Sequence, residues 1–297
     1  MKKILFLTGA MLAGLQLAAT ALAAPTLVST SWLAEHLNDR DMVVLHVASL
    51  RRDYETGHVP GARYLWAGAL AQGTPEMTFE RVPLRQLREA LEALGVSNRS
   101  RVILCGVGGN VSSTARMFLT LEYAGLGDST SILDGQFDAW KTEGRAISTE
   151  TPRIRRASFH PRVHEDVFVK AEWVRDHMHA PGVDIVDARA PQFYNGASAG
   201  QPRAGHIPGA KSLYFATLVD STNHMLPANR LAELFEKAGV KPGDEIATYC
   251  HVGQTASTVY LAARTLGYKV HLYDGSFDDW SGRMDLPVEA PPDSTKK

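Results

Sequence analysis

The sequence has only two cysteines among its 297 residues and no excess of charge of either sign. Two cysteines cannot build a disulfide framework, so a hydrophobic core has to hold the fold. Lys and Arg number 31 against 32 Asp and Glu, which leaves no basic surplus for a phosphate backbone, and we expect no nucleic-acid partner. The hydrophobic content of 44% is ordinary for a globular chain and excludes intrinsic disorder or a fibrous repeat. At about 150 residues per domain, this length predicts two domains.

Long apolar runs are also absent, except at the N-terminus. Two lysines precede an apolar stretch over residues 4–17, and the small-residue site Ala21-Leu22-Ala23 follows it. This arrangement is typical of a cleaved signal peptide. We therefore expect residues 1–23 to be removed, and the mature protein to be periplasmic or secreted with no membrane partner. An uncleaved anchor is the alternative, although the apolar stretch is short for a spanning helix.

Two sequence motifs each occur twice, in the same order. The sequence G-H-V-P-G-A at residues 57–62 recurs as G-H-I-P-G-A at residues 205–210. The sequence D-G-Q-F-D-A-W at residues 134–140 recurs as D-G-S-F-D-D-W at residues 274–280. Such self-similarity is the signature of a duplicated module. The sequence therefore predicts a tandem duplication.

Each copy alternates short apolar runs with helical patterns. Runs such as 42–47 and 183–186 suit buried strands, whereas 84–94 and 231–238 have the apolar spacing of helices. Short strands separated by helices imply parallel pairing, so we expect two α/β domains, each a mostly parallel sheet with helices on both faces. The other expected strands are 102–104, 131–133, 246–249 and 270–273, and the other expected helices are 114–124 and 257–266.

The domain boundaries follow from the repeats and from a change in composition between them. A stretch rich in Arg, His and Pro, without helical periodicity, separates the two copies. We expect an N-terminal domain over 24–150, a linker over 151–165 and a C-terminal domain over 166–297.

The strongest chemical signal is the sequence Y-C-H-V-G-Q-T-A-S at residues 249–257, which follows an apolar strand and opens a helix. Ligands of parallel sheets bind beyond the carboxyl ends of the strands, which is where Cys250 falls. The N-terminus of a helix offers unpaired N–H groups that bind anions and lower the pKa of a thiol. By position alone, Cys250 is either a nucleophile or a buried packing residue.

Together with the two repeated motifs and the sequence Val186-Asp187-Ala188-Arg189, this loop resembles the tandem, two-domain rhodanese sulfurtransferases. The resemblance covers about the whole mature chain. It implies a catalytic Cys250 in the C-terminal rhodanese-like domain and an N-terminal domain without catalysis. The implied reaction moves a sulfane sulfur from a small anionic donor, such as thiosulfate, to cyanide or a thiol through a persulfide on Cys250.

The resemblance also implies the residues that bind the transferred sulfur and its donor. The expected cradle is the loop backbone of His251, Val252, Gly253, Gln254, Thr255 and Ala256. Family members that act on thiosulfate often carry basic residues after the cysteine and an arginine where Phe193 stands here. We therefore expect Arg189 and Arg203 to bind the donor, with an ion pair to Asp187 as the alternative role of Arg189.

Asp187 and Asp274 are expected to support the site from the ends of their strands. No cofactor is expected. None of the 11 histidines has the spacing of metal ligands, so no metal site is expected either.

The first copy departs from the pattern, because His46 and Ala48 replace Asp187 and Arg189. Aligning the strands places Cys105 level with Tyr249, whereas aligning the C-x-V-G sequences places it level with Cys250. Cys105 is therefore either a second active-site thiol or a packing residue. A disulfide between the two cysteines, formed after export, is a further alternative.

A related loop chemistry is excluded by the sequence itself. A phosphatase of the C-x5-R type needs an arginine to clamp the phosphoryl oxygens, and Ala256 stands at that position. The sequence leaves open 3-mercaptopyruvate as the donor, a persulfide carrier without turnover, and the oligomeric state.

Overall fold

The computed structural model describes residues 23–73, 79–108 and 111–290. Within these ranges, two five-stranded sheets contain only parallel strand pairs. The first has the order β1 (Leu27–Val28), β7 (Thr130–Leu133), β6 (Arg101–Gly106), β2 (Met42–Ala48), β3 (Arg63–Trp66). The second has the order β8 (Phe168–Val169), β12 (Lys269–Tyr273), β11 (Glu245–Tyr249), β9 (Val183–Asp187), β10 (Lys211–Ser212).

The two strand orders are the same when each strand is matched to its counterpart in the other domain, which confirms the predicted duplication and the parallel α/β fold. The first domain also has a short antiparallel pair, β4 (Ala71–Gln72) and β5 (Glu80–Arg81).

The helices alternate with the strands along the chain. Those of the first domain are α1 (Thr30–His36), α2 (Arg51–Glu55), α3 (Leu84–Ala93), α4 (Val111–Tyr123) and α5 (Gln136–Thr142). Those of the second are α6 (Ala171–His177), α7 (Pro191–Tyr194), α8 (Ala228–Lys237), α9 (Ala256–Thr265) and α10 (Ser276–Gly282). Short 3-10 turns occur at Gly127–Ser129, Glu165–Val167 and Phe215–Leu218.

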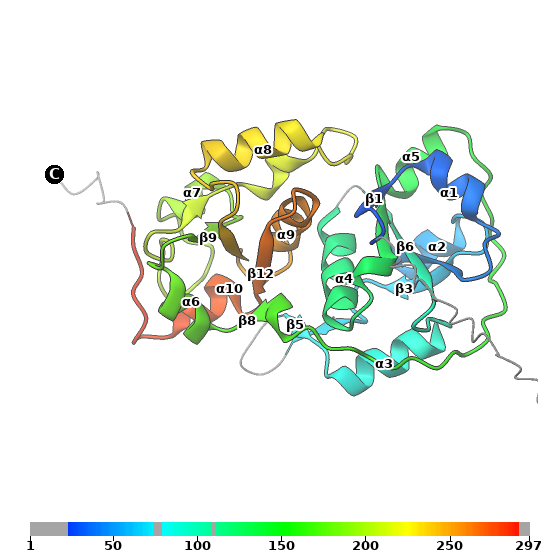
Figure 1. Ribbon diagram of the computed structural model, residues 1–297, viewed down its shortest axis with the longest axis horizontal. Helices are drawn as coiled ribbons and strands as arrows, with labels where there is room; N and C mark the ends of the chain where they lie inside the picture. Colours follow the sequence, from blue (N-terminus) through cyan, green and yellow to red (C-terminus); the bar gives the residue numbers. More distant parts are fainter. Residues whose placement is uncertain (1–22, 74–78, 109–110, 291–297) are drawn as a thin grey trace, which may run out of the picture.

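Two helices, α4 and α9, lie side by side between the two sheets (Figure 1). Nearly every residue of α4, and every residue of α9 from Ala256 to Ala263, is buried. Helices that are buried all round belong to the centre of a protein, whereas α3 and α8 bury only one face each. The hydroxyl oxygens of Ser112 on α4 and Thr258 on α9 are 2.8 Å apart across the contact.

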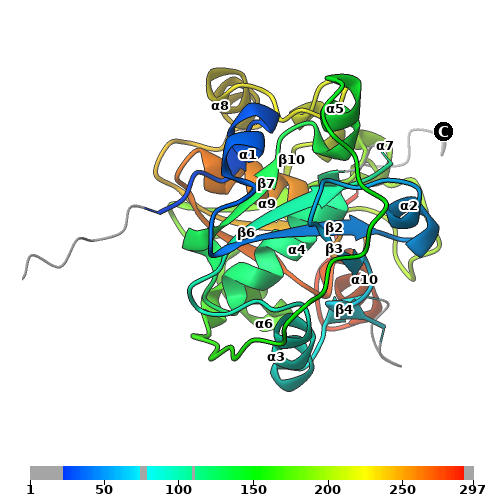
Figure 2. The ribbon, with the colours of Figure 1, turned by 90° about the vertical axis from the view of Figure 1, so that its right-hand side faces the viewer.

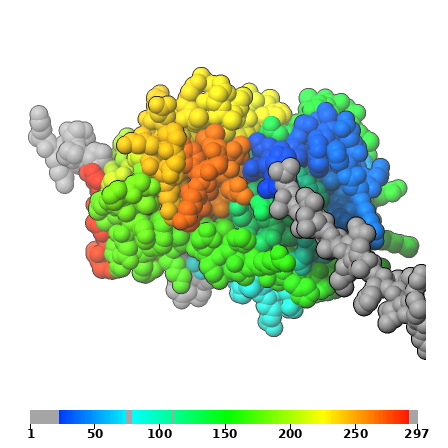
Figure 3. All heavy atoms as spheres, in the orientation of Figure 1, coloured from blue at the N-terminus to red at the C-terminus, as the bar shows by residue number. Residues whose placement is uncertain are grey.

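One hydrophobic core continues across the domain boundary, because residues of α4, α9 and both sheets belong to the same buried cluster. A smaller cluster fills the outer side of each sheet, and Trp140 and Trp280 of the repeated D-G-x-F-x-x-W motifs are buried in them. On the face seen in Figure 3, the yellow and orange surface of the second domain abuts the blue surface of the first.

The segment after α5 lies along the first domain before it enters the second. Figure 2 shows it, in green, running from α5 toward α3. Phe159 of this segment is fully buried, and the N–H groups of Ala157 and Phe159 donate to the backbone and carboxylate oxygens of Glu92. The expected linker over 151–165 is thus packed against α3.

The expected signal peptide lies, apart from Ala23, outside the described residues. Among the residues that are described, no helix combines the length and the apolar character needed to cross a bilayer.

Candidate active site

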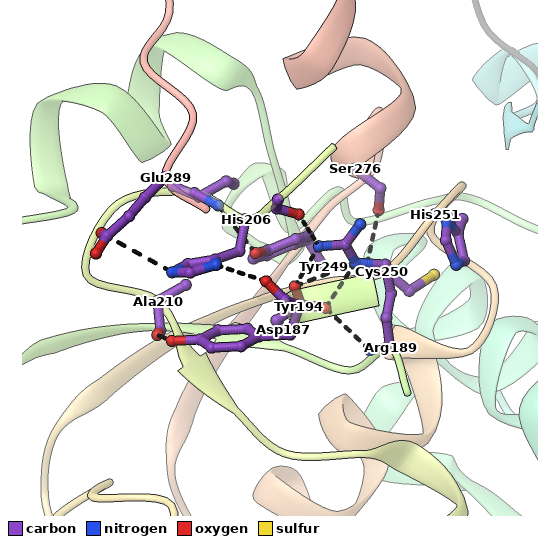
Figure 4. Close-up of polar contacts among 12 residues, drawn as sticks. Asp187, Arg189, Tyr194, His206, Ala210, Tyr249, Cys250, His251, Ser276 and Glu289 are labelled. Atoms are coloured by element: carbon purple, nitrogen blue, oxygen red, sulfur yellow. Dashed lines mark hydrogen bonds and ion pairs between the residues drawn. The ribbon is translucent and has the colours of Figure 1, made fainter. Parts of the chain in front are cut away.

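Cys250 directly follows β11, the central strand of the second sheet, and a five-residue bend separates it from the first residue of α9 (Figure 4). Tyr249, the last residue of β11, is the register partner of Asp187 at the end of β9. The loop therefore lies beyond the carboxyl ends of the strands, at the edge where parallel sheets bind ligands.

The start of α10 fixes the first two carbonyl groups of the loop. The N–H of Phe277 donates to the Cys250 carbonyl at 3.0 Å, and the N–H of Asp278 donates to the His251 carbonyl at 2.9 Å. In a trans peptide the C=O and the following N–H point in opposite directions. The N–H groups of His251 and Val252 therefore point away from α10, and we infer that they face the inside of the loop.

A third carbonyl, that of Gly253, is also fixed from outside the loop. It accepts a hydrogen bond from the Ser257 hydroxyl at 3.1 Å and one from Nη1 of Arg116 at 3.4 Å. By the same peptide geometry, the N–H of Gln254 points into the loop. Gly253 has a φ of +79°, and a Cβ at this position would lie 2.7 Å from the Asp274 carbonyl oxygen, so both conformation and space require glycine.

The loop therefore has the form of a cup of N–H groups. Within the described parts of the chain, no acceptor takes a hydrogen bond from the backbone N–H groups of residues 251–256. Buried N–H groups are nearly always paired, so a cluster of unpaired ones is suited to an anion.

Cys250 directly precedes this cup, belongs to the buried cluster that continues across the domain boundary, and is almost closed off from solvent, with 1% of its surface exposed. Its N–H donates to the hydroxyl of Ser276 at 3.2 Å, and that hydroxyl donates to the Tyr273 carbonyl at 2.9 Å. The sulfur points away from Ser276 and toward the side of His251 (Figure 4). A donor can therefore reach the sulfur only if the groups that cover it move.

His251, the residue after the cysteine, is half-buried and neutral at pH 7. Burial lowers the pKa of its imidazole, and the nearby Arg189 charge lowers it further. Its Nδ1 is 2.9 Å from the amide nitrogen of Gln201, and its ring meets the Phe193 ring edge to face at 4.7 Å. His251 is thus held in place by the uncharged side chains of Gln201 and Phe193 and contributes no positive charge beside the thiol.

Arg189 is placed differently from its expected role in donor binding. Its guanidinium is buried and makes a two-pronged ion pair with Asp187, at 2.9 Å from Nε to Oδ1 and 2.6 Å from Nη2 to Oδ2. Nη2 also donates to the Gly205 carbonyl at 2.7 Å, and the Phe277 ring lies 4.0 Å away. Burial lowers the pKa of the Arg189 guanidinium, but the hydrogen bonds and charge of Asp187 outweigh it, and the net shift is upward. With Nε and Nη2 committed to Asp187 and to the Gly205 carbonyl, Arg189 braces the strand ends, which is the alternative role that the sequence left open for it.

Arg203 is also placed away from a donor. Its guanidinium donates to four backbone carbonyls around the end of α10, at distances from 2.6 to 3.0 Å. These carbonyls belong to Trp280, Ser281, Arg283 and Leu286. A side chain committed to four carbonyls fixes the chain after α10, and the expectation that Arg203 binds the donor does not fit this geometry.

Asp274, at the end of β12, does stand beside the loop, and its partner was not foreseen from the sequence. Nη2 of Arg116 lies 2.6 Å from Oδ1 of Asp274, and the N–H of Arg81 donates to Oδ2 at 3.2 Å. Arg81 and Arg116 both come from the first domain. The signal that could have revealed Arg116 is a basic residue in the middle of a helical stretch whose neighbours, from Ala115 to Leu121, carry no charge.

Cys105 lies in the first domain at the position of Tyr249, not of Cys250. It pairs with His46 as Tyr249 pairs with Asp187, which settles the alignment that the sequence left open. Cys105 is fully buried, and burial followed by the charge of Asp138 raises the pKa of its thiol. Both cysteines are free thiols, and the structure contains no disulfide between them. Cys105 lies within the smaller buried cluster of the first domain, as a packing residue does.

A cavity of about 730 Å³ lies between the domains next to the loop. Asp274 and Gly275 line it from the second domain, and Glu80, Arg81 and Pro83 line it from the first. Its remaining lining residues are Glu165, Phe168, Val169, Lys170, Ala171, Glu172, Tyr273, Asp279 and Arg283. Carboxylates outnumber cations on these walls, so the net charge of the cavity does not favour an anion.

No three His, Cys, Asp or Glu side chains in the described ranges are grouped so as to hold a metal ion.

Known proteins with similar sequences cover most of this chain. It is 31% identical to the sulfur carrier protein TtuD of Thermus thermophilus over 88% of this chain and 95% of the relative. It is 29% identical to a 3-mercaptopyruvate sulfurtransferase of Escherichia coli, over 88% of this chain and 97% of the relative. It is 28% identical to a thiosulfate sulfurtransferase of Azotobacter vinelandii, over 89% of this chain and 97% of the relative.

Solved structures share the fold. YnjE superimposes with a TM-score of 0.82 at 24% identity, over 89% of this chain and 68% of that one. Wild-type EanB superimposes with a TM-score of 0.78 at 22% identity, over 89% of this chain and 69% of that one. At these identities the similarity shows the fold alone.

The rhodanese-like domain matches the chain twice, over residues 29–143 and 170–283, and these ranges contain the two parallel sheets almost completely. The two domain matches agree with the relatives that cover most of the chain. The chain therefore belongs to the rhodanese family, as a tandem pair of rhodanese-like domains.

Proposed function

We propose that the protein is a sulfurtransferase in which Cys250 carries the transferred sulfur. The observation that carries the proposal is the cup over residues 251–256, which directly follows Cys250 and in which no backbone N–H has an acceptor among the described residues. A persulfide bears its negative charge on the terminal sulfur, and backbone N–H groups stabilise such a charge without a basic side chain. The names of the sulfurtransferase relatives support the same chemistry.

The reaction has two covalent steps. The Cys250 thiolate attacks the outer sulfur of thiosulfate, a sulfur–sulfur bond forms on Cys250, and the bond to the sulfite group breaks as sulfite leaves. Cyanide or a thiolate then attacks the terminal sulfur, which departs as thiocyanate or a new persulfide, and the Cys250 thiolate is restored. Nucleophile and leaving group are both anions, so neither step needs a proton-relay base.

The basic residues that the sequence offered for donor binding are committed elsewhere. Arg189 is paired with Asp187 and Arg203 is bound to backbone carbonyls, while the residue after the cysteine, His251, is neutral. We therefore expect the N–H dipoles of the cup to provide most of the compensation for the two charges of thiosulfate. This favours 3-mercaptopyruvate, which carries a single carboxylate, as the alternative donor.

A persulfide carrier is a second candidate, favoured by the burial of Cys250 and by the identity to a sulfur carrier protein. In that role the protein would be loaded with sulfur and would release it only to a dedicated protein partner. Enzyme and carrier use the same cysteine and the same cup.

Thiocyanate formation distinguishes these functions. The mature protein is incubated with cyanide and either thiosulfate or 3-mercaptopyruvate, beside the Cys250→Ser variant. Turnover with either donor, abolished in Cys250→Ser, supports the transferase and identifies the preferred donor. A stable persulfide without turnover supports the carrier, and unchanged activity in Cys250→Ser contradicts both.

We also propose that the protein is exported, on the basis of the basic, apolar and small-residue pattern over residues 1–23. Expression with its own N-terminus, followed by N-terminal sequencing of the periplasmic or secreted fraction, tests this. A chain that begins at Ala24 supports export, and a cytoplasmic chain that keeps its first residues contradicts it.

A further inference from the structure

Arg116 is the one residue of the first domain whose side chain hydrogen-bonds the backbone of the Cys250 loop, within the described part of the chain. It stands on α4 and is fully buried. The rings of Phe79 and Phe168 lie 5.2 and 5.1 Å from its guanidinium carbon. A buried guanidinium is costly unless its charge is paired, so this position calls for a specific role.

Two contacts connect the guanidinium to the second domain. Nη1 donates to the Gly253 carbonyl at 3.4 Å, and Nη2 lies 2.6 Å from Oδ1 of Asp274. Asp274 compensates the charge, and its other oxygen accepts the N–H of Arg81. The guanidinium therefore bridges the loop that follows β11 and the end of β12.

We propose that Arg116 is a positioning residue for sulfur transfer, which orients the Gly253–Gln254 peptide of the cup. The inference rests on the proposed function of Cys250 and extends it to the first domain. A guanidinium that holds the Gly253 carbonyl outward turns the Gln254 N–H inward, since the two groups of a trans peptide oppose each other. The first domain thereby contributes to the geometry that holds the persulfide, without a reactive group of its own.

The tight packing around Gly253 supports this role. The Asp274 carbonyl and Nη1 of Arg116 would lie 2.7 and 3.3 Å from a Cβ on Gly253. The Ser257 hydroxyl holds the same carbonyl from the side of α9. With donors from both domains on one oxygen, the peptide has little freedom to rotate.

A second ion pair between the domains provides a matched control. Nε of Arg264, on α9, lies 2.8 Å from a carboxylate oxygen of Glu122, on α4. Arg264 is eight residues beyond the start of α9, which places it about 12 Å along the helix from the loop. Breaking this pair weakens the same domain contact without touching the cup.

The experiment compares four full-length proteins: wild type, Arg116→Lys, Arg116→Met with Asp274→Asn, and the control Arg264→Met with Glu122→Gln. Methionine keeps the apolar contacts of the arginine stem, and the paired change leaves no buried charge alone. Lysine keeps the charge for Asp274, but a single ammonium group does not reproduce the two-pronged bridge.

Three quantities are measured: the rate of persulfide formation on Cys250 with thiosulfate, the lifetime of that persulfide, and backbone hydrogen exchange over residues 250–256. We expect the Arg116→Met/Asp274→Asn protein to form and keep the persulfide about tenfold less well, with faster loop exchange. We expect both the rate of persulfide formation and the persulfide lifetime to fall by about threefold in Arg116→Lys. In the control protein neither should fall by more than about twofold.

A folded Arg116→Met/Asp274→Asn protein that matches the control in persulfide formation and lifetime would overturn the proposal. If that variant does not fold, Arg116→Lys is compared with the control in its place, and equal persulfide formation and lifetime in these two proteins would overturn the proposal. If wild type itself never takes up sulfur, the proposed function of Cys250 fails, and unchanged loop exchange in the variants would then overturn the positioning role as well.

Discussion

Gly106 and Cys250 occupy equivalent positions in the two sheets. The Gly106 N–H donates to the side-chain oxygen of Gln136 at 2.6 Å, and the Cys250 N–H donates to that of Ser276 at 3.2 Å. Gln136 and Ser276 both follow the Asp-Gly of the repeated motif and both have a positive φ. The first domain thus keeps the backbone hydrogen bond found at the Cys250 position, but has a glycine there in place of the thiol.

Cys105→Ala should therefore leave sulfur transfer intact, within about twofold of wild type. Cys105 packs under the outer helices of the first domain and does not face the cup. The loss of a buried sulfur should cost about 1 kcal/mol of unfolding free energy. Activity and thermal unfolding of the variant test this, and a loss of sulfur transfer at unchanged stability would show that Cys105 takes part in the reaction.

Gly253→Ala should lower sulfur transfer by about a hundredfold, because a Cβ there would meet the Asp274 carbonyl oxygen at 2.7 Å and displace the cup. Gly267→Ala is the matched control, since Gly267 has a similar φ of +83° but a Cβ there would have no atom within 4 Å. Both variants carry the conformational cost of alanine at positive φ, about 1 kcal/mol. Equal activity in the two variants would show that the position of Gly253 does not control the cup.

Phe193→Arg should raise kcat/KM for thiosulfate by about tenfold, and less for 3-mercaptopyruvate, because it adds a cation beside the neutral His251. The exposed neighbour Gln192 provides the control variant Gln192→Arg, with the same change in net charge on the same helix. Steady-state kinetics with both donors give the comparison. If both variants change the donor ratio equally, the effect belongs to net charge and not to the mouth of the cup.

His46→Leu should make the protein less sensitive to acid. Burial, followed by the charge of His58, lowers the pKa of His46 from 6.5 to about 4, and neither ring nitrogen has a hydrogen-bond partner among the described residues. Between these two pKa values, the unfolded chain binds a proton at His46 that the native state does not bind. The stability that depends on a neutral His46 is therefore fully present above pH 6.5 and is lost as the pH falls to 4. The loss reaches about 3 kcal/mol.

Denaturant unfolding of wild type and His46→Leu at pH 7 and pH 4 measures this difference. The variant should keep about 3 kcal/mol more of its stability on acidification than wild type does. Identical pH dependence in the two proteins would mean that His46 takes up its proton without unfolding.

The sequence predicted the central strands of both sheets, because runs such as 42–47 and 246–249 are mostly apolar, as strands buried on both faces are. It missed the short edge strands β1, β8 and β10, where two residues give no measurable periodicity. These strands depend on pairing with a neighbour that is distant in sequence.

The position of the candidate cysteine could be predicted, since it depends on a local strand, loop and helix. The partners of the arginines could not be predicted in the same way. Arg203 is held by backbone carbonyls, which every residue has, and Arg116 reaches a partner in the other domain. Local sequence carries no information about either contact, and only the packing of α4 against α9 creates the second.

The measurement that tests the central claim most directly is the mass of the intact protein after exposure to a sulfane donor and removal of the excess. Wild type and Cys105→Ala should each gain the mass of one sulfur atom, located on Cys250 by peptide mapping, and cyanide should remove it as thiocyanate. Cys250→Ala should gain nothing. A sulfur adduct that persists in Cys250→Ala, or its absence from wild type with every donor tried, would contradict the account.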